Sequence, residues 1–285
     1  MNKIIVTGAS GFIGRSLVRT LKKMQYDVIE ISTRQCDLSD PASIDYLSQF
    51  SADYVYHVAG KVGIPLSFEY PLMFYRANVD TTRHVLEYCR KKQVPMHYVS
   101  AYIYGVPASL PIDETVCPRP NNPYAHSKYM AELLCQFYRE HFQVPVTISR
   151  PFNIYGWDEA STLFISSVYR QLQQEESVTV GDLSPMRDYV YIDDVVDALI
   201  AIMQHGINGE VYNIGTGESF SCGQVIQILQ SIMRLNKPVI ETKSVRVSDI
   251  ADVRADISKM FNQTGWKPSF SLLQGLSDMV GETYV

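Results

Sequence analysis

The chain has 285 residues, and its 25 Lys and Arg against 30 Asp and Glu give a formal net charge of −5. Apolar residues make up 46% and charged residues 19%, a balance that excludes disordered and collagen-like chains and allows a large buried core. No apolar run approaches the roughly 20 residues of a membrane span, and no basic block occurs. We therefore expect neither a membrane nor a nucleic acid as partner.

The cysteines are odd in number and scattered, without a CxxC pair, and the six histidines show no metal-ligand spacing. We expect no disulfide framework and no metal site, and the start of the chain does not have the pattern of a signal peptide. These features predict a cytoplasmic protein, where thiols stay reduced. The cysteines are Cys36, Cys89, Cys117, Cys135 and Cys222.

Short β-rich segments alternate with helical patterns through the first half of the chain. Strands are expected at 3–6, 28–31, 54–59, 96–100 and 144–149, and helices near 15–24, 79–88 and 124–138. Strands separated by helices form βαβ units. The pattern predicts an α/β fold with a doubly wound parallel sheet covered on both faces.

Three glycines with a spacing of three residues follow the first strand. The first permits a tight turn, the second lets a pyrophosphate approach backbone N–H groups, and the third allows close packing of helix on strand. A plain strand-to-helix turn is the alternative, but the position favours a dinucleotide phosphate site. The residues assigned to it are Gly8, Ser10, Gly11, Phe12, Ile13 and Gly14.

The second strand ends near the expected position of the adenosine ribose. Ser32 is the predicted ribose neighbour, and Arg34 lies just beyond it. A neutral side chain with a guanidinium suits a 2′-phosphate, so we predict NADP(H) as the cofactor. The alternative is NAD(H), with Glu30 on the ribose and Arg34 as a solvated loop cation.

After Arg150 and Pro151 the alternation becomes less regular, with helices expected at 162–173 and 193–203 and strands at 177–180 and 210–214. This change in pattern predicts that the chain forms two structural units. Residues 1–152 plus about 188–215 would form a Rossmann domain that binds NAD(P). Residues 153–187 plus 216–285 would form a smaller substrate-binding lobe.

A phenol and an ammonium stand four residues apart, at Tyr124 and Lys128, on one face of a predicted helix. Asn122 and Pro123 fit the N-cap and the first helical position. A nearby ammonium lowers the pKa of a tyrosine toward the range of a general base, although a surface helix pair has the same spacing. Ser100, at the end of the fourth strand, could hydrogen-bond a reacting carbonyl or alcohol while Tyr124 moves the proton.

Together these residues resemble the extended short-chain dehydrogenase/reductase family, which includes nucleotide-sugar epimerases, dehydratases and ketoreductases. The similar segments run almost from end to end. They include TGASGFIG at 7–14, DLSD at 37–40, HVAG at 57–60, SAYIYG at 100–105, YAHSK at 124–128, RPFNIYG at 150–156 and RDYVYIDDVVDA at 187–198.

The resemblance implies roles for particular residues. Ser100, Tyr124 and Lys128 would be catalytic, with Lys128 also holding the nicotinamide ribose. Further cofactor contacts would come from Asp37, Leu38, Val58, Ala59, Gly60, Val99 and Pro151. The substrate, a nucleoside-diphosphate sugar, would meet Tyr102, Asn153, Arg187 and Arg246. The two arginines could instead be surface cations or members of interdomain ion pairs.

Family members usually form homodimers through the helices that here carry NVDTT and YAHSK, so we expect a homodimer. The apolar stripe of Met130, Leu133, Leu134 and Phe137 could lie at that interface or face the sheet.

Departures from the family pattern narrow the chemistry. The 4,6-dehydratases carry Asp-Glu after the catalytic hydroxyl residue, where this chain has Ala101 and Tyr102. Only the short segment 33–36 separates the second strand from DLSD, as in 4-ketoreductases. We predict an NADPH-linked reductase of a 4-keto-6-deoxy nucleotide sugar. The alternatives are a 4-epimerase with retained NAD and, from another class, a non-catalytic dinucleotide-binding sensor or scaffold.

Overall fold

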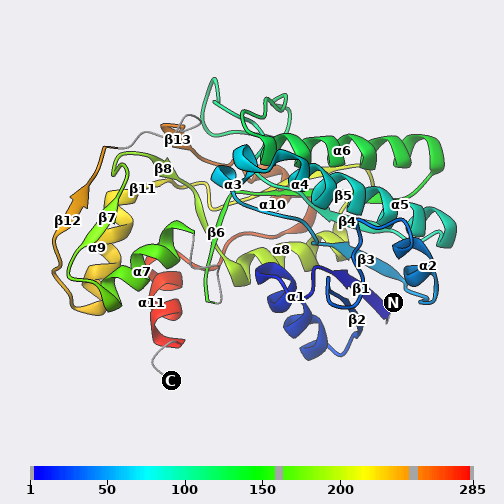
Figure 1. The fold of residues 1–285 in the computed structure, drawn as a ribbon, viewed down its shortest axis with the longest axis horizontal. Coiled ribbons are helices and arrows are strands. Elements are labelled where there is room, and N and C mark those ends of the chain that lie inside the picture. Colours follow the sequence, from blue (N-terminus) through cyan, green and yellow to red (C-terminus); the bar gives the residue numbers. More distant parts are fainter. Residues whose placement is uncertain (1–2, 158–162, 244–249, 283–285) are drawn as a thin grey trace.

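A computed structural model describes residues 3–157, 163–243 and 250–282. Its main sheet has six parallel strands in the order β10-β5-β4-β3-β1-β2 (Figure 1). The strands are β1 (Lys3–Thr7), β2 (Asp27–Ile31), β3 (Tyr54–His57), β4 (Met96–Val99), β5 (Val146–Pro151) and β10 (Val211–Ile214). The predicted Rossmann sheet is thus confirmed.

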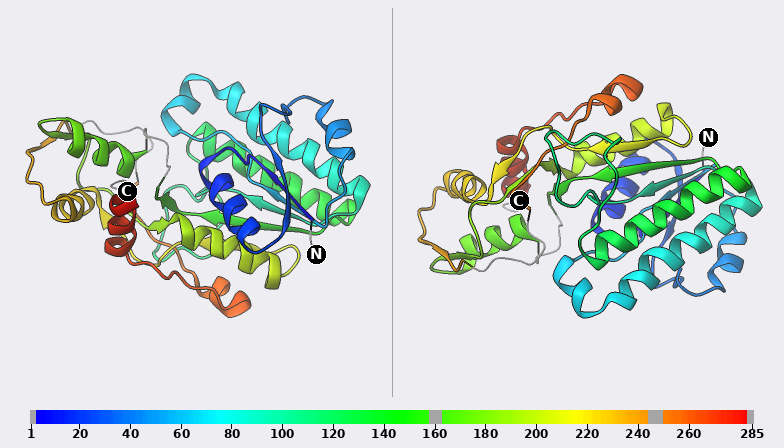
Figure 2. Two further views of the ribbon diagram at one scale, coloured as in Figure 1. Left: turned by 90° about the horizontal axis from the view of Figure 1, so that it is seen from below. Right: turned by 90° about the horizontal axis from the view of Figure 1, so that it is seen from above.

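Helices cover both faces of this sheet (Figure 2). One face carries α1 (Phe12–Lys23) and α8 (Ile192–His205), with α10 (Ser258–Thr264) packed on α8 and β10. The other carries α2 (Ser43–Ser48), α5 (Thr81–Lys92) and α6 (Pro123–Phe142), preceded by α3 (Ile64–Glu69), α4 (Pro71–Tyr75) and the π-helical turn η1 (Arg76–Asp80).

The main sheet has a hydrophobic core on each face, because successive side chains of a strand point to opposite faces. In β1, Ile4 and Val6 belong to the core beneath α1 and α8. Ile5 belongs to the core beneath α5 and α6. All three are fully buried, so β1 is apolar throughout, as expected for a central parallel strand.

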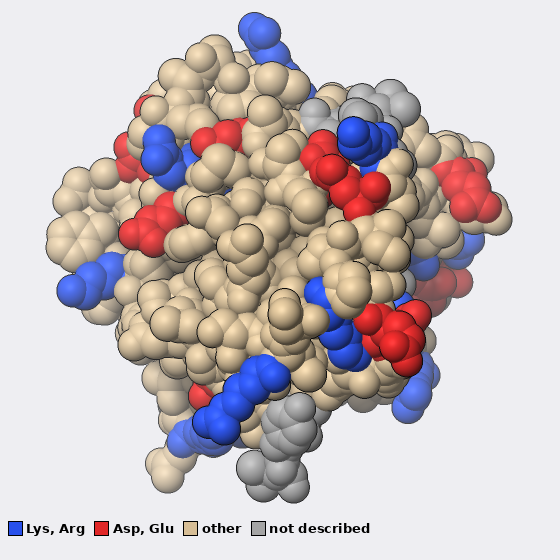
Figure 3. Space-filling model, turned by 90° about the vertical axis from the view of Figure 1, so that its left-hand side faces the viewer, with Lys and Arg blue, Asp and Glu red and all other residues tan. Residues whose placement is uncertain are grey.

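Smaller sheets occupy the other end of the molecule, on the left in Figure 1. Their strands are β6 (Asn153–Tyr155) with β9 (Tyr189–Tyr191), β7 (Val178–Val180) with β12 (Val239–Glu241), and β8 (Met186–Arg187) between β11 (Phe220–Ser221) and β13 (Asp252–Val253). Three helices accompany them: α7 (Phe164–Gln174), α9 (Cys222–Met233) and α11 (Leu272–Glu282). We call this end the small lobe. Positive and negative side chains are interspersed over its outer face (Figure 3).

The expected helix at 79–88 is part of a longer helical run. It begins at Pro71, passes through the π turn and ends at Lys92. The run ends because Gln93 takes the left-handed conformation, with a φ of 55°. Among the described residues, no helix is long and apolar enough to cross a bilayer.

Candidate active site

The glycine loop joins β1 to α1 beside the point where the strand order reverses, between β1 and β3. Gly8 has a φ of +69°, and a Cβ there would lie 2.7 Å from the backbone of Ala59, just after β3. A Cβ on Gly14 would lie 2.1 Å from the Gly8 carbonyl oxygen. Only glycine fits at these two positions. The loop therefore lies where open α/β sheets bind ligands, at the carboxyl ends of the strands.

Gly11, the middle glycine, is the N-cap of α1 and has no side chain with which to cap the helix. A Cβ there would meet only the Gly8 carbonyl oxygen, at 3.2 Å. The first turn of α1, which includes Phe12 and Ile13, thus presents backbone N–H groups without a side-chain acceptor. These features fit the pyrophosphate of a dinucleotide.

The end of β2 carries the predicted ribose and phosphate contacts. Ser32 donates from its backbone N and its hydroxyl to Oε1 of Gln35, at 2.8 and 2.7 Å. Arg34 is exposed in the loop that follows. Glu30, the alternative ribose ligand, forms an ion pair with Lys22 of α1. Glu30 is thus engaged with Lys22, whereas the Arg34 side chain is exposed to solvent.

The next predicted cofactor residues lie in the loop before α2. Asp37 accepts hydrogen bonds from the backbone N and the hydroxyl of Ser39, which lower the pKa of its carboxyl. It also faces Arg76 at 3.7 Å. Leu38 is buried, and its carbonyl oxygen lies 2.8 Å from Nδ1 of His84. The loop is therefore anchored to η1 and α5.

Residues 58–60 follow β3 directly beside the glycine loop. The Ala59 backbone N donates to the Thr7 hydroxyl at 3.2 Å. A Cβ on Gly60 would lie 2.8 Å from Oδ1 of Asn78 and 3.2 Å from Nζ of Lys128. The segment between the glycine loop and Lys128 therefore has no room for a side chain at position 60.

Ser100 follows β4, and its backbone N donates to the Ser149 carbonyl of β5 at 2.8 Å. The side chain of Ser100, unlike its backbone, makes no such contact with the described residues. The residue is 4% exposed, and its hydroxyl has no hydrogen-bond partner among the described residues. Because nearly all buried polar groups are satisfied, an orphan hydroxyl at the carboxyl edge of the sheet marks a place where a ligand completes the site.

Tyr124 lies in the first turn of α6, which begins as predicted. The side chain of Asn122 caps the helix by accepting from the Ala125 backbone N at 2.9 Å. Tyr124 packs against a cluster that includes Ala101, the residue after Ser100. It also meets Phe74 edge to face, at 6.2 Å between ring centroids. The structure thus brings Tyr124 to the end of β4.

Lys128 is almost fully buried one turn further along α6. Its Nζ donates to the Val99 carbonyl oxygen at 2.7 Å and lies 4.8 Å from the centroid of the Tyr98 ring. Burial lowers the pKa of Lys128 to about 8, while the charge of Glu132 opposes this shift. The ammonium is held at the end of β4 by a carbonyl oxygen and an aromatic face.

Burial raises the pKa of the Tyr124 phenol above its ordinary value of 10.0. The lowered pKa expected from the sequence is therefore wrong for the protein alone, because desolvation of the phenolate dominates. The phenol therefore keeps its proton at neutral pH, as an ordinary tyrosine does, and the raised pKa makes it a weaker acid. Transfer of that proton would need a group that stabilises the phenolate, and the Lys128 ammonium lies one turn along the same helix.

The family model for the NAD dependent epimerase/dehydratase family matches residues 4–215. The chain belongs to this family. It is 29% identical to GDP-6-deoxy-D-mannose reductase of Pseudomonas aeruginosa, over 98% of this chain and 96% of the relative. The resemblance to the extended short-chain dehydrogenase/reductase group is confirmed, and with it the assignment of the chain as an enzyme of that type.

Two solved structures are similar to this epimerase/dehydratase-family chain over nearly its whole length. RMD from Pseudomonas aeruginosa complexed with NADPH has a TM-score of 0.92 at 29% identity and covers 100% of both chains. UDP-glucose 4-epimerase from Thermotoga maritima, solved with UDP-glucose, has a TM-score of 0.94 at 28% identity and covers 99% of this chain and 98% of its own. These likenesses support a nicotinamide dinucleotide as the cofactor.

Two of the predicted substrate residues lie near each other in this family member. The Arg187 guanidinium donates to the Ile250 carbonyl oxygen at 2.6 Å. Burial raises the pKa of Tyr102, and the positive charge of Arg187 opposes that rise. The Tyr102 hydroxyl donates to the Gly105 carbonyl oxygen at 2.5 Å. Arg187 is thus partly engaged in holding the small lobe.

The other two predicted substrate residues are Asn153 and Arg246, and the predicted cofactor residue Pro151 lies near the first of them. Pro151 ends β5, and Asn153 begins β6, where its backbone N donates to the Asp188 carbonyl oxygen at 3.0 Å. Arg246 lies outside the described residues.

Sequence reasoning missed the buried ion pair of Glu132 and Arg150. The two side chains are 0% and 4% exposed, and Arg150 Nη2 lies 2.7 Å from Glu132 Oε2. A signal was available, since Glu132 lies four residues after Lys128 and so shares its buried helix face. The cationic partner at the end of β5 could not be deduced from spacing alone.

Proposed function

We propose that this enzyme is an NADPH-linked reductase that converts the C4 ketone of a 4-keto-6-deoxy nucleotide sugar into an alcohol. The observation that carries the proposal is that two hydroxyl groups lie at the end of β4. Among the described residues the buried Ser100 hydroxyl has no hydrogen-bond partner, and Tyr124 packs against a cluster that includes Ala101, the next residue. The Ser100 hydroxyl can donate a hydrogen bond to a carbonyl oxygen, and the neutral Tyr124 phenol can transfer its proton to that oxygen when the Lys128 ammonium stabilises the phenolate.

In this mechanism the Ser100 hydroxyl orients the C4 carbonyl, and Tyr124 transfers its proton to the carbonyl oxygen. A bound nicotinamide cofactor would supply the hydride for C4, which together with the proton from Tyr124 balances the reduction of the ketone to an alcohol. Lys128, fixed by the Val99 carbonyl oxygen, stabilises the phenolate left on Tyr124. Its ammonium would also hold the nicotinamide ribose.

Three observations favour reduction with NADPH. The loop after β2 is short and exposes Arg34, a charge suited to a 2′-phosphate. Glu30 is paired with Lys22 instead of being free for a ribose. A related structure is complexed with NADPH, and relatives include GDP-6-deoxy-D-mannose reductase and GDP-6-deoxy-D-talose 4-dehydrogenase, the latter 28% identical. Guanosine diphosphate sugars are therefore the first substrates to test.

The substrate would lie between the Rossmann domain and the small lobe. We propose that Tyr102 and Asn153 contact the sugar and that Arg187 and Arg246 neutralise the diphosphate, because guanidinium groups match phosphate oxygens in geometry and charge. The division into residues 1–152 plus about 188–215 and a substrate-binding remainder is part of this proposal.

A nucleotide-sugar 4-epimerase is the second candidate. The same Ser100, Tyr124 and Lys128 working in reverse would oxidise C4, and a similar structure is a UDP-glucose 4-epimerase bound to UDP-glucose. An epimerase retains its NAD through the cycle, whereas a reductase exchanges its cofactor at each turnover. The intact catalytic residues offer no support for a non-catalytic scaffold.

One experiment separates the two activities. Purified protein is gel-filtered, any dinucleotide released on denaturation is identified, and the 4-keto form of GDP-6-deoxy-D-mannose is supplied with NADPH. We expect no retained NAD and one NADPH oxidised per sugar reduced. Retained NAD, no net use of NADPH and interconversion of UDP-sugars at C4 would establish the epimerase instead.

We also propose a homodimer in the cytoplasm. Met130, Leu133 and Phe137 of α6 are 38%, 46% and 50% exposed, so the stripe they form faces away from the sheet. Contact with a second copy would bury it. Light scattering tests this: Leu133→Glu should yield monomers, whereas Leu273→Glu, at a 55% exposed position on α11, should leave the dimer unchanged. A wild-type monomer would contradict the proposal.

A further inference from the structure

Three buried side chains of alternating charge lie between α6 and the end of β5. Lys128 and Glu132 are four residues apart on α6, so they are neighbours on one face of the helix, and both are buried there. Arg150 of β5 contacts Glu132 from the sheet and is buried as well. A buried charge is costly unless an opposite charge lies nearby, and Glu132 lies beside two buried cations.

The Glu132 carboxylate is held in place by Arg150. Arg150 Nε donates to Oε1 and Oε2 of Glu132 at 3.1 and 3.2 Å, and Nη2 donates to Oε2 at 2.7 Å. Nη1 of Arg150 donates to the Tyr104 hydroxyl at 3.0 Å, which fixes the guanidinium. These charge-assisted hydrogen bonds therefore fix a negative charge one helical turn from Lys128.

Other titratable side chains lie near Lys128 in the described part of the chain, and burial leaves them uncharged. They are His57 of β3, Tyr98 of β4, and Tyr124 and Cys135 of α6. Burial lowers the pKa of the histidine to about 3 and raises the pKa values of the two phenols and the thiol, so all four are neutral at neutral pH. Among these described groups, the Glu132 carboxylate is the one that brings a negative charge.

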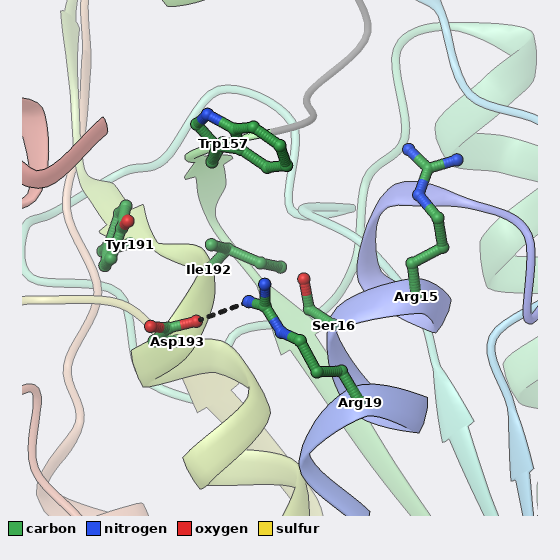
Figure 4. A pocket seen from close by; sticks show the side chains of 7 residues that line it. All are labelled: Arg15, Ser16, Arg19, Trp157, Tyr191, Ile192 and Asp193. Atoms are coloured by element: carbon green, nitrogen blue, oxygen red, sulfur yellow. Dashed lines mark ion pairs between the residues drawn. The ribbon is translucent and has the colours of Figure 1, made fainter. Parts of the chain in front are cut away.

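Charged groups on the surrounding helices are paired with one another. On the α6 side of the sheet, the pairs are Asp80 with Arg83, at 3.4 Å, and Glu87 with Arg90, at 2.9 Å. On the opposite side, charged residues line a cavity between α1 and α8, where Asp193 lies 3.8 Å from Arg19 (Figure 4). The sheet separates this cavity from Lys128, so Glu132 is the anion that acts on the lysine.

We propose that Glu132 is a positioning residue that keeps Lys128 charged in the core, and that Arg150 holds the Glu132 carboxylate in place for this role. The inference rests on the proposed role of Lys128, because only a protonated lysine can stabilise the phenolate of Tyr124. Burial lowers the pKa of Lys128 to about 8, and the charge of Glu132 opposes that shift. Without Glu132, desolvation would lead the lysine to lose its proton nearer to neutral pH.

The charge of Lys128 can be followed by NMR of the whole protein labelled with carbon-13 at lysine Cε, and Lys128→Met identifies the signal. We expect Glu132→Gln to lower the midpoint of the Lys128 titration by at least about one pH unit, because a unit charge one turn away in a buried site contributes that much. Glu132→Asp keeps the charge and should restore most of the midpoint. An unchanged midpoint in Glu132→Gln would overturn the inference.

Two further variants separate this electrostatic role from a structural one. Glu132→Gln combined with Arg150→Met leaves no buried cation without its anion, so it decides the question if Glu132→Gln does not fold, and its midpoint should also be lower. Tyr104→Phe removes a hydroxyl from the same network without changing a charge, and it should leave the midpoint unchanged. Equal shifts in Tyr104→Phe and Glu132→Gln would mean that packing, not charge, controls Lys128.

Turnover provides a second measurement. With NADPH and a 4-keto substrate, the loss of kcat in Glu132→Gln should be largest at alkaline pH and should shrink toward about pH 6, where Lys128 is protonated again. A loss that is equal at every pH would show that Glu132 acts only through the fold. The NMR titration needs no turnover, so it tests the role of Glu132 even if the chain is not a reductase.

Discussion

The proposed catalytic corner around Ser100, at the end of β4, and the junction between the main sheet and the small lobe are both buried and polar. They differ in whether their polar groups have hydrogen-bond partners. At the junction, the Asp188 carboxylate accepts hydrogen bonds of 2.7–3.0 Å from Thr216, Gly217 and Ala255. At the corner, the Ser100 hydroxyl has no partner among the described residues. Both residues are nearly inaccessible, at 0% and 4% exposure.

A second chain of contacts reinforces the junction. Arg150, paired with Glu132, also donates to the Tyr104 hydroxyl at 3.0 Å, and that hydroxyl donates to Asn213 Oδ1 at 2.7 Å. A buried network of this kind holds one geometry, because moving any member would leave a buried charge or polar group without a partner. The comparison teaches that satisfied polar groups hold this junction in place, whereas the unsatisfied Ser100 hydroxyl lies where we propose that the substrate binds.

The largest expected effect is at the corner. Tyr124→Phe removes the proton donor, and we expect kcat to fall by roughly 10²–10⁴ with little change in dinucleotide affinity. Steady-state NADPH oxidation and dinucleotide titration measure the two quantities. The control is Tyr75→Phe, which removes a hydroxyl that lies 3.1 Å from Nδ1 of His126, and it should keep its activity. Full turnover in Tyr124→Phe would remove Tyr124 from the mechanism.

Substitutions at the junction should instead lower the free energy of unfolding. Asp188→Ala leaves several buried donors without an acceptor, and we expect a loss of roughly 3–5 kcal/mol in the free energy of unfolding. Ser100→Ala breaks no side-chain hydrogen bond and should change that free energy by less than about 1 kcal/mol while kcat falls. Urea unfolding of both variants measures the contrast, and the control is Asp182→Ala, at a partly exposed carboxylate that accepts hydrogen bonds from the nearby Ser184. Equal destabilisation by Asp188→Ala and Ser100→Ala would contradict the distinction.

Two buried histidines extend the comparison to pH. His57 lies between the hydroxyls of Thr7 and Thr82, at 2.8 and 3.0 Å, and burial lowers its pKa to about 3. His97 is equally buried, and its pKa is also lowered to about 3. Both rings therefore stay neutral in the folded protein, whereas in the unfolded chain they take up protons below about pH 6.5.

The unfolded state thus binds more protons between pH 6.5 and 3, so stability must fall as the pH falls. Protonation of each histidine in the unfolded chain should lower the free energy of unfolding by roughly 2 kcal/mol at pH 5 relative to neutral pH. Chemical unfolding at several pH values measures this slope, and His97→Gln should reduce it. A slope that His97→Gln leaves unchanged would show that His97 titrates normally.

The smallest expected effect is at the exposed end of the cofactor site. Arg34→Gln removes one charge-assisted contact, and we expect NADPH to bind roughly tenfold more weakly while NADH binding stays the same. Fluorescence titration with both cofactors measures the ratio, and Arg170→Gln, on an exposed face of α7, is the control. Equal weakening of both cofactors would mean that Arg34 does not recognise a 2′-phosphate.

Much of the fold and part of the site could be predicted from short stretches of chain. The glycine spacing of the first turn predicted the positions where the structure leaves no room for a Cβ. The four-residue spacing of Tyr124 and Lys128 predicted their shared helix, and the Asn122 cap forms as expected. The longer helical run with its π turn and the short helices α2 and α3 lacked a strong periodic pattern and were not predicted.

Contacts between distant segments could not be predicted in the same way. The side chain of Asp188 lies next to an arginine in the sequence, yet it bonds to residues 216, 217 and 255. The pKa of Tyr124 was predicted in the wrong direction, because spacing showed the nearby lysine but not how far burial would desolvate the phenol. The periodic pattern of α6 likewise did not decide whether its apolar stripe faces the sheet or the solvent. Periodicity shows that a helix face is apolar but not which segment packs on it.

The amino-acid sequence by itself determined the parallel sheet, the glycine turn and the helix that carries the phenol and the ammonium, since these depend on backbone conformation and on residues within a few positions of one another. Only the tertiary structure decided which polar groups are satisfied. Hydrogen-bond partners and desolvation are set by segments that folding brings together from far along the chain, and these leave Ser100 without a partner while Asp188 is surrounded by donors.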